Sequence, residues 1–137
     1  MKLLYADMTE EEQEQNKVYM LCSDIIRSYA FQRATDLYDD MPYSEAGGAF
    51  QELFYPKYDT QEEIYMNIME TLKNAAAELS EYQFQTDAQE SKFSSVDILC
   101  NGDLDKWIRM ANSLRLRMAM RLCHVKPDAA LSTIKEL

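Results

Sequence analysis

Apolar residues recur every three or four positions along three long segments of this chain, residues 9–38, 60–79 and 103–122. This spacing places the apolar residues of each segment on one face of an α-helix. Only three glycines and three prolines occur in the 137 residues, so few positions interrupt a helix. The pattern predicts an all-α fold, in which antiparallel helices bury their apolar faces against one another.

The starts of the helices carry recognisable signals. Thr9 stands three residues before Glu12, and Thr60 stands three residues before Glu63, which is the pattern of a capping box. Pro127 suits the first turn of a helix, so a fourth, shorter helix is predicted to follow it. A chain of this length can bury a core without further domains, and residues 1–137 are predicted to form a single helical domain.

The corner after the first helix is rich in acids. Pro42 biases Met41 away from the helical conformation, so the helix must end by Asp40. The acids could imitate a calcium loop, but the DxDxDG spacing is missing and no glutamate stands at the twelfth position. We therefore expect a solvated corner formed by Asp36, Asp39, Asp40 and Glu45.

Residues 80–100 are polar and show no helical period. We expect an irregular loop there, in which the apolar stretch VDILC forms a short extended piece or a single turn. Gly102 then interrupts the chain, and Asp103 is predicted to cap the third helix. Trp107 lies on the apolar face of that helix and is predicted to be part of the core.

The chain has a formal net charge of −10 and a pI near 4.5. Neutralising phosphates requires a surplus of Lys and Arg, so no nucleic-acid partner is expected. Residues 103–124 are locally basic, with two acids against five bases. Four arginines of this segment are predicted to pair with acidic neighbours inside the fold: Arg109, Arg115, Arg117 and Arg121.

Few residues suggest a metal or a reaction. Cys22, Cys100 and Cys123 form no CxxC pair, and His124 is the single histidine, so no metal site is expected. The thiols are predicted to be buried and to act as small hydrophobes. Cys123 and His124 are adjacent at a helix end, and adjacent helical residues do not face each other, so they make a poor nucleophile and base. No phosphate loop or GxSxG motif is present, and no cofactor is predicted.

Six aromatic residues lie in or beside the segment that joins the first two helices: Tyr38, Tyr43, Phe50, Phe54, Tyr55 and Tyr58. Rings in such a segment can pack it against the helices, and we favour this interpretation for most of them. They can also stack on the flat face of a sugar, which combines apolar contact with a polar rim. The candidates for a ligand contact of this kind are Tyr43, Phe54, Tyr55 and Tyr58.

Three blocks of sequence, in this order, resemble the SusD/RagB-type family: YAFQRATDLYDDMPYSEA (29–46), PKYDTQEEIYMNIMETLKNAA (56–76) and GDLDKWIRMANSLRLRMAMRL (102–122). The first block resembles the family's Asp-Leu-Tyr-Gly-Asp-x-Pro-Tyr corner. Asp39 departs from it, because the family usually has glycine there. The resemblance implies that Asp39 ends a helix in the left-handed conformation, at a modest cost for aspartate.

The resemblance implies a SusD-like fold, mainly α-helical, with tetratricopeptide-like helix pairs. It also implies a non-catalytic lipoprotein on the surface of a Gram-negative outer membrane, which captures glycans or other nutrients and works with a TonB-dependent transporter. Family members are longer and begin with a signal peptide and a lipid-bearing cysteine, so the resemblance predicts that these residues are an internal piece of a longer protein. The alternative is a stand-alone helical adaptor that binds partner proteins.

Overall fold

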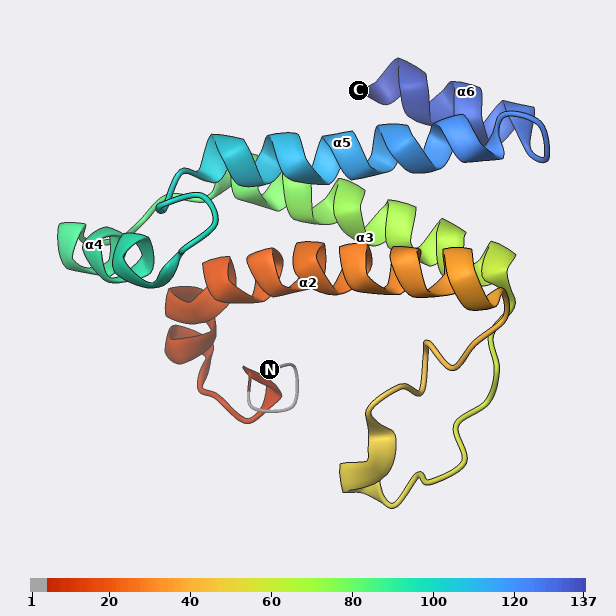
Figure 1. Ribbon diagram of the computed structural model, residues 1–137. Helices are drawn as coiled ribbons and strands as arrows, with labels where there is room; N and C mark the ends of the chain where they lie inside the picture. Colours follow the sequence, from red (N-terminus) through yellow and green to blue (C-terminus); the bar gives the residue numbers. More distant parts are fainter. Residues whose placement is uncertain (1–4) are drawn as a thin grey trace.

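The computed structural model describes residues 5–137, except for the side chains of Phe50 and Gln51. Its helices, shown in Figure 1, are α2 (Glu10–Tyr38), the 3-10 helix η1 (Gly48–Gln51), α3 (Gln61–Glu81), α4 (Asp87–Val96), α5 (Leu104–Leu122) and α6 (Pro127–Glu136). In this range β pairing is confined to one isolated antiparallel bridge, between Met41 and Asp59. The prediction of an all-α fold is confirmed.

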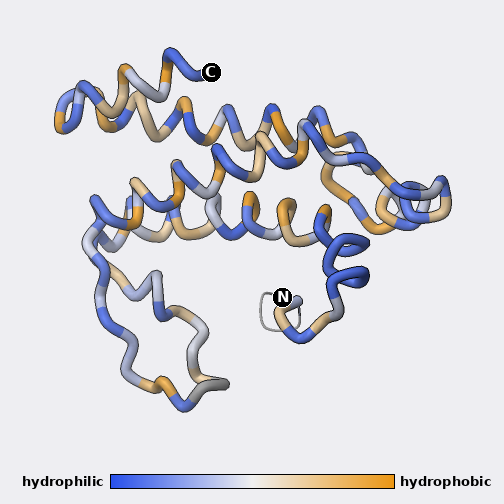
Figure 2. Tube along the Cα trace, turned by 180° about the vertical axis from the view of Figure 1, so that it is seen from behind, coloured by the Kyte–Doolittle hydropathy of each residue, from blue (hydrophilic) through white to orange (hydrophobic). Residues whose placement is uncertain are grey.

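The long helices stack in the order of the chain, each antiparallel to the one before it (Figure 1). Helix α3 packs between α2 and α5, and α5 packs in turn against α6. Ile64, Ile68 and Leu72 of α3 are completely buried, and Trp107 of α5 lies in the core as predicted. Figure 2 shows hydrophobic and hydrophilic residues alternating along these helices, which is the pattern of amphipathic helices packed on one side.

Both capping boxes form as predicted. The Thr9 hydroxyl accepts the Glu12 N–H at 3.3 Å, and the Glu12 carboxylate accepts the Thr9 N–H at 2.9 Å. Thr60 and Glu63 repeat this arrangement at the start of α3. The side chain of Asp103 caps α5. These bonds satisfy backbone N–H groups that a helix start would otherwise leave without a partner.

The expectation of an irregular loop over residues 80–100 is wrong, because α4 lies within it. Phe93 is the only buried residue of this short helix, so no apolar stripe marks it in the sequence. Its local signal is Thr86, whose side chain caps its start. The residues after α4 form a turn, one of the two shapes expected for VDILC: the Asn101 N–H donates to the Asp97 carbonyl at 3.0 Å.

The buried face of α2 changes character along the helix. Its buried residues are Val18, Leu21, Cys22, Ile25, Ser28, Gln32 and Thr35. The first four continue the predicted apolar stripe, whereas the last three are polar. The apolar period predicted over residues 9–38 includes Leu37 and Tyr38 at its end, but each of these side chains is 74% exposed. In the second half of α2 the buried positions still recur with the helical period, but polar residues occupy them.

The acids at the end of α2 have structural partners. The Asp36 carboxylate accepts hydrogen bonds from Tyr65 and Arg121 and so joins α2 to α3 and α5. Asp40 accepts the Gln61 N–H at the start of α3 at 2.8 Å. The expectation of a solvated corner is wrong for Asp36, which is only partly exposed and bonds to two other helices.

Two of the four arginines expected to form ion pairs do so. Arg115 contacts a glutamate of α6 at 2.7 Å, and Arg121 contacts Asp36. Arg109 and Arg117 are exposed and form no ion pair with any residue between 5 and 137. Two basic side chains therefore stand on the outside of an acidic protein.

Asp39 ends α2 in a strained conformation, with φ 65° and ψ −126°. The positive φ agrees with the glycine that the resemblance implies at this position. The ψ angle, however, lies far from the left-handed helical region that aspartate tolerates. Glycine reaches this conformation readily and other residues rarely do, so the strain exceeds the modest cost expected from the sequence.

Replacing Asp39 with glycine should raise the free energy of unfolding by about 1–2 kcal/mol, because the backbone strain disappears. The N–H bond from residue 39 to the Thr35 carbonyl is kept. Urea titrations followed by circular dichroism measure the change. Asp39→Ala removes the charge at the helix end but keeps the strain, so its gain should be at most a few tenths of a kcal/mol. Equal gains from both variants would show that the backbone is not the cause.

Candidate functional site

Residues 41–59 form a closed loop between α2 and α3, here called the aromatic loop, which projects away from the stacked helices (Figure 1). Its two ends pair with each other. The Met41 N–H donates to the Asp59 carbonyl at 3.2 Å, and the Asp59 N–H donates to the Met41 carbonyl at 3.1 Å. Connections longer than about 12–15 residues are uncommon in compact domains and are usually functional when ordered. The aromatic loop is therefore the first candidate site.

Asp59 anchors the base of the aromatic loop from inside. Its side chain is almost completely buried and accepts the Ser44 N–H at 2.6 Å, the Ser44 hydroxyl at 2.9 Å and the Tyr43 N–H at 3.1 Å. Lys57 forms an ion pair with the same carboxylate at 3.2 Å. The bonds from Ser44, with those from Lys57 and Tyr43, outweigh burial and lower the pKa of Asp59 to about 2.

Acidification should release this anchor between about pH 4 and pH 2. The pKa of folded Asp59 lies below its ordinary value of 3.8, so its stabilising effect is complete above that value and is lost as the pH falls through about 2. In NMR titrations, the amide signals of Tyr43 and Ser44 should therefore shift with a midpoint near the lowered pKa. The step should be absent in Asp59→Asn. A midpoint at the ordinary carboxyl pKa would contradict the anchoring role.

Tyr43, one of the four predicted ligand contacts, supports the loop rather than facing solvent. Its side chain is buried, and its hydroxyl donates to Asn67 Oδ1 of α3 at 2.6 Å. Its ring meets Phe31 of α2 edge to face, with the ring centroids 4.9 Å apart. The Arg27 guanidinium lies 5.0 Å from the centroid of the same ring. Tyr43 thus fastens the aromatic loop to two helices.

The other three predicted contacts are exposed on one arm of the aromatic loop. The exposed fractions of Phe54, Tyr55 and Tyr58 are 69%, 94% and 71%. The expectation that most of the rings pack against the helices is wrong for these three and for Tyr38, which is 74% exposed. The side chain of Phe50 lies outside the described part of the chain. The loop therefore presents rings to solvent while its base is held by buried groups.

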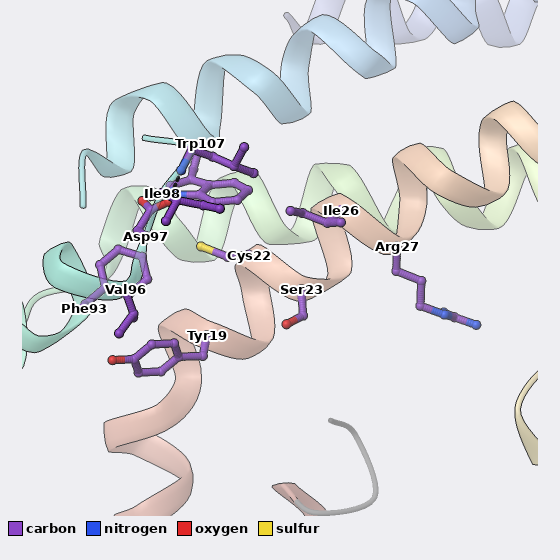
Figure 3. Close-up of a pocket in the computed structure, with 11 residues that line it drawn as sticks. Tyr19, Cys22, Ser23, Ile26, Arg27, Phe93, Val96, Asp97, Ile98 and Trp107 are labelled. Carbon is purple, nitrogen blue, oxygen red and sulfur yellow. Dashed lines mark hydrogen bonds between the residues drawn. The ribbon is translucent and has the colours of Figure 1, made fainter. Parts of the chain in front are cut away.

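A second candidate site, which sequence reasoning missed, is an apolar hollow of about 420 Å³ (Figure 3). Tyr19 and Ile26 of α2 line it together with Phe93 of α4 and Trp107 of α5. Ile98, in the turn between α4 and α5, is 89% exposed at this hollow. The lining comes from three helices and a turn, so no single periodic segment could have revealed it.

Asp97 organises the turn beside this hollow. Its carboxylate accepts the Trp107 indole N–H at 2.8 Å and the Gly102 N–H at 2.9 Å (Figure 3 draws both Asp97 and Trp107). Burial alone would raise the pKa of Asp97, but the hydrogen bonds it accepts lower that pKa overall. Burial also raises the pKa of the nearby Cys22 thiol to about 12. Since the thiolate is the nucleophile, the raised pKa disfavours reaction of this cysteine at neutral pH.

Across residues 5–137, no group of three or more His, Cys, Asp and Glu side chains is placed to hold a metal ion. Cys22 and Cys100 are buried as predicted, whereas Cys123 is partly exposed. Cys123 and His124 lie at the end of α5, in agreement with the sequence. None of the helices in this range combines the length and the hydropathy that a bilayer crossing requires.

Comparison with known families gives a match over almost the whole chain. The model of a SusD-like family, described as starch-binding and associating with the outer membrane, matches residues 2–137. The chain belongs to the SusD-like family. A separate comparison with curated proteins finds no match.

SusD homologs of known structure share this fold. One from Bacteroides vulgatus ATCC 8482 is 29% identical, with a TM-score of 0.76, over 98% of this chain and 25% of that chain. A chitin-binding SusD homolog from Flavobacterium johnsoniae is 33% identical, with a TM-score of 0.73, over 91% of this chain and 24% of that chain. A third, from Bacteroides ovatus ATCC 8483, is 33% identical, with a TM-score of 0.69, over 85% of this chain and 22% of that chain.

The stacked helix pairs therefore correspond to the tetratricopeptide-like architecture that the resemblance implied. The chain spans about a quarter of the length of these SusD homologs.

Proposed function

We propose that this SusD-like chain takes part in binding a glycan at the outer-membrane surface, without catalysis, in a protein that works with a TonB-dependent transporter. The family description names starch binding and association with the outer membrane, and one structural relative is described as chitin-binding. The observation that carries the proposal is the aromatic loop, which exposes Phe54, Tyr55 and Tyr58 on an anchored base.

Exposed rings on a fixed base suit sugar recognition. A flat pyranose face stacks on an aromatic ring, and a tyrosine hydroxyl at the ring edge can bond to the sugar's own hydroxyls. The Asp59 anchor and the buried Tyr43 hold the loop before any ligand arrives, so less ordering is required on binding. The net charge of −10 disfavours anionic ligands, which leaves neutral glycans as the favoured class.

The buried carboxylates that could be considered for acid catalysis already accept hydrogen bonds within the fold. A glycosidase needs a carboxylic acid whose pKa is raised, so that it can donate a proton near neutral pH. Asp59 and Asp97, the buried carboxylates of the described residues, accept several hydrogen bonds each, and the pKa of each is lowered. These environments support binding and structure rather than acid catalysis.

Isothermal titration calorimetry against maltoheptaose and chitohexaose tests the proposal. We expect one of these neutral oligosaccharides to bind the chain. Phe54→Ala/Tyr55→Ala/Tyr58→Ala should weaken that binding at least roughly tenfold, because each stacking ring contributes about 1 kcal/mol. The matched control is Leu131→Ala, which removes an exposed apolar side chain from α6, outside both candidate sites, and should leave the affinity unchanged. Absence of heat with both sugars, or equal losses in both variants, would contradict a sugar site on the loop.

Purification of the natural protein with its membrane tests the partner and the location. We expect it in the outer-membrane fraction, and chemical cross-linking there should capture a TonB-dependent transporter. Recovery in the soluble cytoplasmic fraction, with a peptide or protein bound, would instead support a helical adaptor.

A further inference from the structure

The outward side of α5 carries a surface that the glycan proposal does not use. Arg109, Leu116, Arg117 and Met120 are all exposed, with Leu116 and Met120 at 43% and 58%. Their spacing places them on one side of the helix. Figure 1 shows α5 lying between α3 and α6, and α5 packs against both. We call these four residues the α5 outer stripe.

The charged residues of this stripe are positive, whereas the chain as a whole is negatively charged. The chain carries a net charge of −10, and every other arginine that was expected to pair does so through a carboxylate of another helix. Arg109 and Arg117 form no ion pair with a residue of the described range. The α5 outer stripe is therefore a locally basic surface with two apolar side chains between and beyond its arginines.

We propose that the α5 outer stripe docks an acidic amphipathic helix of a separate protein. The proposal stands on the stripe alone and does not depend on glycan binding by the aromatic loop. A helix rises 1.5 Å per residue, so the stripe runs for about 17 Å, or roughly three turns of a partner helix laid along it. Leu116 and Met120 offer the apolar contact, and methionine adapts to different partners.

The arginines determine the chemistry of that partner. A guanidinium binds a carboxylate through two parallel hydrogen bonds, so Arg109 and Arg117 would each select a glutamate or aspartate beside the partner's apolar face. An anionic lipid surface fits less well, because a flat bilayer would face the acidic surface around the stripe as well as its two arginines, whereas a single helix laid along α5 meets the stripe alone. Charge complementarity therefore favours an acidic helix over a membrane.

The test uses a synthetic helical peptide of about 20 residues, with leucine at every third and fourth position and glutamate elsewhere. Fluorescence anisotropy measures its binding to the 137-residue chain. A second peptide carries lysine in place of every glutamate. We expect the acidic peptide to bind and the basic peptide not to bind the stripe. The methyl NMR signals of Leu116 and Met120 should shift only with the acidic peptide.

Charge reversal tests the arginines. Arg109→Glu/Arg117→Glu should weaken binding of the acidic peptide at least roughly tenfold, and added salt should reduce the wild-type affinity. The matched control, Arg33→Glu/Lys92→Glu, changes the net charge equally at exposed positions of α2 and α4, and should change the affinity by less than about twofold. Circular dichroism checks that both variants fold.

Several outcomes would overturn the proposal. The first is that the two double variants lose affinity equally, which would mean that net charge alone acts. The second is that neither peptide binds, or that both bind alike. The third is that phosphatidylglycerol vesicles bind the stripe and the acidic peptide does not, which would make it a membrane surface. The last is concentration-dependent dimerisation in sedimentation experiments that is lost in Arg109→Glu/Arg117→Glu, which would assign the stripe to a second copy of this chain.

Discussion

Asp97→Ala should lower the free energy of unfolding by about 3–4 kcal/mol, one of the largest losses expected from a single substitution in this chain. The carboxylate accepts four N–H groups, two from Leu99 and Cys100 at 3.1 Å each, and two from Gly102 and Trp107. Alanine leaves all four donors without their acceptor. Those of Cys100 and Trp107 belong to buried residues, where water cannot easily replace the lost bond.

Guanidinium titrations followed by the fluorescence of Trp107, the single tryptophan, measure this loss directly. Asp97→Asn provides the control, because it keeps one of the two acceptor oxygens and the volume of the side chain. We expect it to lose about half as much free energy as the alanine variant. A loss below about 1 kcal/mol in Asp97→Ala would mean that water replaces the carboxylate as the hydrogen-bond acceptor of these N–H groups. Such a result would contradict the burial of Cys100 and Trp107.

Gly102→Ala is the second substitution with a large expected effect, a loss of about 3 kcal/mol or more. Gly102 has φ +79°, which most side chains avoid. A Cβ at this position would also lie 2.8 Å from Ser94 Cβ and 2.9 Å from Ser94 Cα. The second contact is with the backbone of α4, so relief requires α4 and the start of α5 to move apart.

Gly47→Ala is a matched control for the backbone part of this effect. Gly47 has φ +83°, but a Cβ there would meet nothing within 4 Å. Its loss should therefore be about 1 kcal/mol, from the dihedral angle alone. The difference between the two variants, measured by thermal and urea unfolding, isolates the clash with Ser94. Equal losses in stability would show that α4 moves away from the added Cβ without a measurable loss of free energy.

The helices of the stack could be predicted because two independent signals agree at each of them. The apolar period marks the face that is buried, and a capping residue such as Thr9 or Thr60 marks the start. Helix α4 was missed because it buries Phe93 alone, so no apolar stripe marks it in the sequence. The second half of α2 was misjudged because its buried positions include Gln32 and Thr35, so polar side chains replace the signal on which the prediction rests.

The candidate sites were harder to predict, because each depends on residues far apart in the chain. The sequence shows that Tyr43 and Tyr55 are both aromatic residues of one loop. Only the packing of Tyr43 against Phe31, with its hydroxyl bond to Asn67, decides that Tyr43 is buried while Tyr55 is exposed. The apolar hollow could not be predicted for the same reason, because its lining residues come from three helices and a turn that lie far apart in the sequence.

The paired ends of the aromatic loop, Met41 and Asp59, differ from its exposed positions in how strongly folding depends on them. Met41 and Asp59 hold the two ends of the loop together between α2 and α3, so their exchange would disturb folding. Substitutions at exposed positions such as 54, 55 and 58 usually alter stability by no more than about 0.5 kcal/mol. The exposed arm of the loop can therefore change in sequence while the helices that carry it stay the same.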